Sequence, residues 1–133
     1  MRREGGCFCG AVRFEAEGEP IVVTHCHCLH CRRTSGAAFV TWSEFPIDRM
    51  SWTKGKPGTF SSRPAVTRAF CTACGSPLTY QNADTPKSID VITCNFDDPG
   101  AFKPQDHVFC DRQLPWIHLD DGLPRYPSCR TGR

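Results

Sequence analysis

The sequence predicts a single domain, residues 1–133, of mostly antiparallel β structure. Short segments rich in β-branched and aromatic residues recur along the chain, and several of them alternate apolar with polar side chains. The 11 Gly and 11 Pro residues separate these segments instead of gathering in one linker. A chain of 133 residues buries roughly two-thirds of its unfolded surface, which is enough for one core.

Strands are expected over 11–16, 21–24, 38–42, 59–62, 66–70, 77–80, 89–93 and 107–109. Turn residues at 18–20, 55–58 and 97–100 separate or end these strands, because Gly, Pro and Asp favour tight reversals of the backbone. The one short helix is expected over 32–35, directly before Gly36.

Composition and charge exclude several classes of function. The formal net charge is only +2. Nucleic-acid binders are usually much more basic, so no nucleic-acid partner is expected. No apolar run approaches the ~18 residues of a membrane span. The segment after Met1 is charged and has no apolar stretch, so no signal peptide is predicted and a reducing cytoplasm is the expected location. In that setting clustered cysteines usually bind metal.

Ten cysteines are the unusual feature of the composition, and four of them form two short pairs. Cys7 and Cys9 form a C-x-C pair, whose side chains point to the same face of an extended segment. Cys71 and Cys74 form a C-x-x-C turn, and Gly75 follows where such a turn often needs a positive φ. Together the pairs complete a closed, tetrahedral, structural zinc site. The alternatives are buried free thiols or two disulfides.

A second group, Cys26, Cys28 and Cys31, supplies three thiolates within six residues. Three protein ligands with an open fourth position are the pattern of a catalytic zinc. Two alternatives remain: Cys71 and Cys74 could serve this group, or His25, His27, His30 or another cysteine could close it into a purely structural site. Cys94, Cys110 and Cys129 are expected to be small hydrophobic residues or exposed thiols.

Three stretches of the chain, 6–14, 26–36 and 70–78, resemble the glutathione-dependent formaldehyde-activating enzyme family, which also contains centromere protein V. The segments Asp97-Asp98-Pro99, Phe102-Lys103-Pro104 and Pro115-Trp116 fit the same family. The resemblance implies the zinc-bearing β-tent fold and two zinc ions per chain. It assigns the structural zinc to Cys7, Cys9, Cys71 and Cys74, and a labile zinc at the active site to Cys26, Cys28 and Cys31.

The activity implied by the resemblance is that of a carbon-sulfur lyase. The family's reaction adds glutathione to formaldehyde and gives S-hydroxymethylglutathione. A zinc ion with three thiolate ligands is a weak Lewis acid, so we expect it to deliver a thiol more than to polarise a carbonyl. Cys26, Cys28 and Cys31 are therefore the predicted catalytic residues.

Four residues are candidate contacts for the small-molecule thiol and aldehyde. Arg32 and Arg33 follow the second cysteine group, and an Arg guanidinium binds carboxylates such as those of glutathione in a bidentate manner. His107 and Trp116 are expected to line a pocket. The alternative to an enzyme is a non-enzymatic domain with two zinc ions that binds a protein partner.

Overall fold

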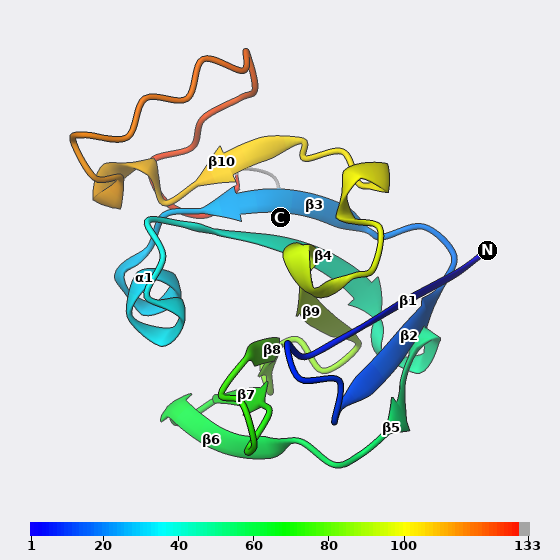
Figure 1. Cartoon of the computed structure of the whole chain (residues 1–133). Helices are drawn as coiled ribbons and strands as arrows, with labels where there is room; N and C mark the ends of the chain where they lie inside the picture. The colour runs from blue at the N-terminus through cyan, green and yellow to red at the C-terminus, as the bar shows by residue number, and fades with distance from the viewer. Residues whose placement is uncertain (131–133) are drawn as a thin grey trace.

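The computed structural model describes residues 1–130 (Figure 1). The strands are β1 (Arg2–Gly6), β2 (Arg13–Glu17), β3 (Val22–Cys26), β4 (Val40–Pro46), β5 (Met50–Lys54), β6 (Gly58–Arg63), β7 (Val66–Phe70), β8 (Pro77–Asn82), β9 (Ser88–Ile92) and β10 (Asp106–Val108). The α-helix is α1 (Leu29–Ser35), and four 3-10 turns are η1 (Ile47–Arg49), η2 (Thr93–Asn95), η3 (Pro99–Ala101) and η4 (Cys110–Arg112). The prediction of a mostly β fold is confirmed.

The strands form two sheets. The larger sheet has seven strands in the order β10-β3-β4-β9-β8-β7-β6, and the smaller has three in the order β1-β2-β5. Neighbours are antiparallel, as predicted, except that β10 pairs parallel with β3. Figure 1 shows β3, β4 and β10 across the top of the molecule, β6, β7 and β8 at its base, and α1 at one end.

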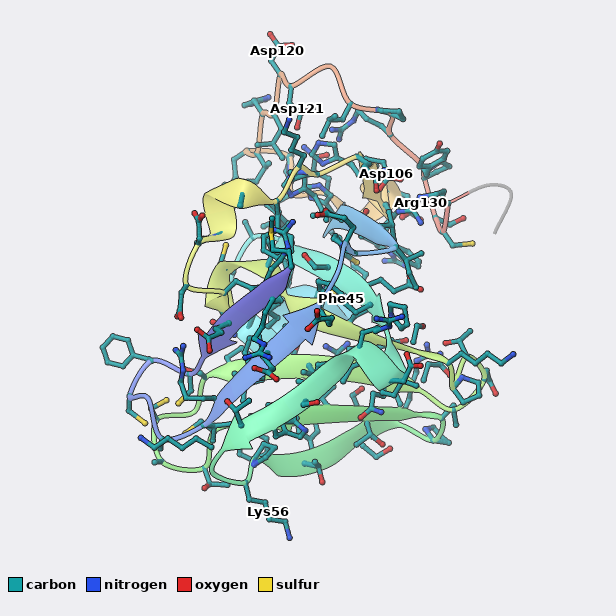
Figure 2. All side chains as sticks on the ribbon, turned by 90° about the vertical axis from the view of Figure 1, so that its right-hand side faces the viewer. Phe45, Lys56, Asp106, Asp120, Asp121 and Arg130 are labelled. Carbon is teal, nitrogen blue, oxygen red and sulfur yellow. The ribbon has the colours of Figure 1, made fainter. Side chains whose placement is uncertain are left out.

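The main core consists of aromatic and aliphatic side chains from both sheets. Phe14 on β2 is fully buried, and its ring meets Phe96 edge to face with the centroids 5.2 Å apart. Phe45 on β4, also fully buried, packs on the same ring at 5.9 Å (Figure 2). Cys7 and Cys71 belong to this core, so the first cysteine group lies at its edge.

A second, smaller core lies on the other face of the large sheet, where Cys26 and Trp42 also line a cavity. Its buried members are Cys26, Cys31, Val40, Trp42, Ile92 and Val108. Two of these are cysteines of the second group, so each cysteine group is anchored in a different core.

Two strands, β1 and β5, lie outside the segments that the sequence predicts. The β1 segment ends in Gly5 and Gly6, which have weak strand propensity. The structure shows why Gly5 fits: a Cβ there would lie 2.4 Å from the backbone oxygen of Asn95 and 2.7 Å from the ring of Phe14. Close approach of β1 to the core therefore requires glycine at this position.

The short helix is longer than predicted and begins at Leu29. Cys28 is its N-cap, and the backbone N–H of Cys31 donates to the Cys28 sulfur at 3.3 Å. The helix ends at Gly36, which has a left-handed φ of 72° and donates its N–H to the Arg32 carbonyl at 2.7 Å. Within residues 1–130 no helix is long and apolar enough to cross a membrane.

Candidate metal centres and active site

Cys7, Cys9, Cys71 and Cys74 lie together, with their four sulfur atoms within 4.8 Å of one another. The Cys7 and Cys9 sulfurs are 3.6 Å apart, and Cys9 and Cys71 are 3.8 Å apart. Zinc-sulfur bonds of about 2.3 Å in a tetrahedron place the sulfurs about 3.8 Å from one another, so these four residues fit a zinc ion. All ten cysteines are free thiols, so no disulfide competes for them.

Hydrogen bonds from the surrounding loops hold this four-cysteine group in place. Gly75, with a left-handed φ of 79°, donates its N–H to the Cys71 carbonyl at 2.8 Å and closes the second turn. The Ser76 hydroxyl accepts from the backbone N–H of Phe8 at 2.9 Å, which ties the two turns together. The same hydroxyl lies 3.2 Å from the Cys74 sulfur and lowers the pKa of Cys74 to about 5. A thiolate is the form that binds metal.

Cys26, Cys28 and Cys31 form a separate group, again with their sulfurs within 4.8 Å. Cys26 ends β3, Cys28 caps α1 and Cys31 lies in its first turn. The indole N–H of Trp42, on the neighbouring strand β4, donates to the Cys31 sulfur at 3.3 Å. Hydrogen bonds from Cys26 and then Cys31 lower the pKa of Cys28, which favours the thiolate at this sulfur. Three converging sulfurs fit a zinc ion with one position left open.

The three-cysteine group opens onto a cavity of about 620 Å³. Aromatic, cationic and acidic side chains line it beside the cysteines: Trp42, Tyr80, Arg63, Arg68, Arg130, Glu44 and Asp90. Cys129, which had no assigned role, also lines it, whereas the four-cysteine group does not. The second group therefore faces a cavity that a small molecule can enter, whereas the first lies between two loop turns, with Cys9 exposed to solvent.

Arg68 forms one wall of the cavity and is only 5% exposed. Its Nη1 donates to the Thr34 hydroxyl at 3.3 Å and its Nε donates to the Ser62 hydroxyl at 3.1 Å. The guanidinium lies 5.0 Å from the ring centre of Tyr80 and 5.9 Å from that of Trp42. Arg68 thus fastens α1 to the strands that carry the aromatic walls.

The sequence motifs did not point to Trp42, Tyr80 or the three cavity arginines. These residues lie on strands or in the C-terminal segment, outside the cysteine motifs. Only the fold brings them to the three-cysteine group.

The four predicted substrate contacts lie elsewhere among the described residues. Arg32 is half-buried and Arg33 exposed on α1, and neither lines the cavity. His107 is fully buried on the opposite face of β10, and Trp116 is 66% exposed in the segment after β10. Contact of these residues with a substrate stays a prediction.

Fold and site together define a class: mostly β proteins with two cysteine groups that can hold metal, one of which faces a cavity. A family model described as glutathione-dependent formaldehyde-activating enzyme matches residues 2–112. The chain belongs to this family, which confirms the resemblance seen in the cysteine motifs.

Two individual proteins resemble this chain at low sequence identity. An uncharacterized lyase of Schizosaccharomyces pombe is 30% identical over 89 residues, and this match covers 65% of the chain and 64% of the relative. A crystal structure of a Rhodobacter sphaeroides protein superimposes with a TM-score of 0.59 at 20% identity, covering 92% of this chain and 98% of that one. The second comparison supports the fold alone.

Proposed function

We propose that the protein is a zinc-dependent carbon-sulfur lyase that forms or cleaves an S-hydroxymethyl adduct of a glutathione-like thiol and a small aldehyde such as formaldehyde. One observation carries the proposal: the three sulfurs of Cys26, Cys28 and Cys31 converge on the wall of the cavity. Membership of the formaldehyde-activating family supports this chemistry at the family level, and the name of the yeast relative supports a lyase.

Cys26, Cys28 and Cys31 would hold the zinc ion of this reaction, and Cys7, Cys9, Cys71 and Cys74 a second, structural one. Zinc bound at the three-cysteine group would lower the pKa of an incoming thiol, so that the nucleophilic thiolate exists at neutral pH. The N–H of Trp42 stabilises negative charge on the Cys31 sulfur and fixes its direction.

The cavity walls would bind and orient the thiol substrate. Trp42 and Tyr80 offer apolar surface that excludes water beside the cysteines. Arg130 is paired with Asp106 in a salt bridge, and Arg68 is buried between rings, so both positions are fixed by the protein. Arg63 is exposed and donates to the Tyr80 hydroxyl at 3.3 Å. We assign Arg63 to binding a substrate carboxylate through its bidentate guanidinium.

The test is an NMR exchange assay of formaldehyde with glutathione, with and without protein, repeated with other thiols. The protein is expected to accelerate adduct formation, and Arg63→Gln is expected to raise KM for glutathione with less change in kcat. Arg49→Gln, an exposed arginine in η1 away from the cavity, is the matched control. A KM effect of Arg33→Gln instead would favour the contact predicted from the sequence.

No acceleration with any thiol would refute the lyase. The alternative is then the partner-binding domain, for which two zinc ions equally resistant to a mild chelator are expected. The lyase requires the ion of the three-cysteine group to be the more labile one.

A further inference from the structure

Strand β3 presents different chemistry on its two faces. Thr24 and Cys26 line the cavity, and His25 between them points to the other face, since side chains alternate along a strand. Strand β10 runs parallel to β3, with His107 in register with His25. The two imidazole rings lie side by side, with their centres 4.8 Å apart.

A carboxylate from the C-terminal segment completes this histidine pair. The Nε2 atom of His107 lies 2.7 Å from the Oδ2 atom of Asp121. One nitrogen from each of the two histidines and one carboxylate oxygen of Asp121 lie within 4.8 Å of one another. His107 is fully buried, while Asp121 is exposed, so the group is reachable from solvent on one side.

Each histidine has a hydrogen bond at Nδ1, which would orient the ring with Nε2 as the ligand atom. The Nδ1 atom of His25 lies 2.8 Å from the Thr41 hydroxyl, and the Nδ1 atom of His107 lies 3.0 Å from the Nε2 atom of His27. Ligating histidines characteristically use the second nitrogen in this way, which fixes the ring and directs the first nitrogen to the metal. A nitrogen that ligates is unprotonated, so His107 then donates from Nδ1 to His27.

We propose that His25, His107 and Asp121 form a further metal site, distinct from both cysteine groups, for a divalent first-row transition ion such as Zn²⁺, Co²⁺ or Fe²⁺. Two imidazoles and one carboxylate suit these ions, and three ligands leave open coordination positions. The site needs neither the thiol nor the aldehyde of the proposed lyase reaction.

The ion would join the C-terminal segment to the edge of the large sheet. Figure 1 shows this segment looping out beyond β10 and returning to the sheet. Asp121 lies on its outward loop, and Cys129 and Arg130, which line the cavity, lie on its return. Figure 2 shows Asp106 and Arg130 together at the sheet, with Asp120 at the outer tip of the loop and Asp121 next to it. Binding at Asp121 therefore restrains the segment that carries part of the cavity wall.

The experiment starts from the full chain with its cysteine groups loaded with zinc, and adds Co²⁺. One further Co²⁺ per chain is expected, without the intense sulfur-to-cobalt absorption that marks cobalt bound by thiolates. The variant Asp121→Asn should lose this ion and keep the zinc content of the wild type. Asp120→Asn is the matched control, because it removes the neighbouring exposed carboxylate and should retain the ion.

A second variant tests the orienting hydrogen bond. Thr41→Val removes the partner of His25 Nδ1 and should weaken binding of the further Co²⁺ by about 10–100-fold, the usual effect of losing such a partner. Thermal unfolding of each variant shows whether it folds. The proposal is overturned if the wild type retains no additional Co²⁺, or if Asp121→Asn and Asp120→Asn bind it equally well.

Discussion

The two cysteine groups differ in how far apart their members lie along the chain. Cys9 and Cys71, which touch in the four-cysteine group, are 62 residues apart in sequence. The three-cysteine group is contained in the end of one strand and the first turn of one helix. A ligand set that joins distant segments restrains the whole fold, because it closes a long loop. A local set restrains little and leaves one side open to the cavity.

The surroundings of the two cysteine groups also differ. Loop hydrogen bonds hold the four-cysteine group beside the main core. One tryptophan N–H and a large cavity flank the three-cysteine group. Stability and reactivity are thus expected to depend on different cysteine groups, and the following changes test that division.

The largest effect is expected for Cys74→Ser. Structural zinc sites contribute about 10–16 kcal/mol of apparent binding free energy, against a net folding stability of about 5–15 kcal/mol. The variant should therefore lose its zinc and unfold, as measured by metal content and far-UV circular dichroism. Cys94→Ser, at an exposed cysteine outside both groups, is the control and should melt like the wild type. A cooperative, native-like melt of Cys74→Ser would contradict the structural role of this group.

The next largest effect separates activity from stability. Cys28→Ser should abolish the zinc of the three-cysteine group and the acceleration of adduct formation. Its free energy of unfolding should change by no more than about 3 kcal/mol, since the four-cysteine group is untouched. The measurements are metal content, the NMR exchange assay and urea unfolding. Activity retained in this variant would show that the three-cysteine group is not the catalytic centre.

A smaller effect is expected for Trp42→Phe, which keeps an aromatic wall and removes the N–H donor to Cys31. Loss of such a partner usually costs about 10–100-fold in metal affinity. Competition with a chelator should show this loss at the three-cysteine group and none at the four-cysteine group. Trp52→Phe, in the main core, is the control, because Trp52 packs edge to face on Phe14 at 6.1 Å. If Trp42→Phe and Trp52→Phe bind metal at the three-cysteine group with equal affinity, the hydrogen bond to Cys31 does not contribute to metal binding.

The smallest effect concerns a surface ion pair near the four-cysteine group. Arg13 donates to both carboxylate oxygens of Asp97, at 3.0 and 2.5 Å, and this hydrogen bonding lowers the pKa of Asp97. A lowered folded-state pKa stabilises the protein above the unfolded pKa of about 3.9, and the contribution is lost as pH falls through the folded value.

Because Asp97 is 55% exposed, Asp97→Asn should cost no more than about 1 kcal/mol at neutral pH. The difference from wild type should vanish in acid, as measured by urea unfolding across pH. Asp98→Asn, next in sequence, should show no such pH-dependent difference. If the difference in unfolding free energy between Asp97→Asn and the wild type grew as pH fell, the Arg13–Asp97 pair would not be its cause.

Most strands were predictable because their side chains alternate and Gly or Pro marks their ends. Segment 66–70 is predicted with the bounds that β7 has in the structure, since a turn precedes it and a cysteine turn follows. The β1 strand could not be found this way. Its polar and glycine residues become a strand only because β2 offers a partner and the core leaves no room for a Cβ at Gly5.

The cysteine groups were suggested by spacing along the chain, whereas the cavity was not. Arg68 lies on β7 and Trp42 on β4, and the sequence of neither strand marks these residues as part of a site. Trp42 meets Cys31 because α1 packs against β4, and Arg68 reaches Thr34 of α1 from β7 although β9 and β8 lie between β4 and β7 in the sheet. The histidine pair could not be predicted from the sequence either, since His25 and His107 meet only because β10 pairs parallel with β3.

The hydrogen bond from Trp42 to Cys31 also gives the protein an internal optical probe. The chain has three tryptophans, and they occupy unlike environments: Trp42 is 7% exposed against a sulfur, Trp52 is partly buried in the main core, and Trp116 is 66% exposed. Sulfur in contact with an excited indole quenches its emission, and the extent depends on the charge of that sulfur. Intrinsic fluorescence of the Trp52→Phe, Trp116→Phe double variant should therefore follow the loading of the three-cysteine group in real time, without any added dye.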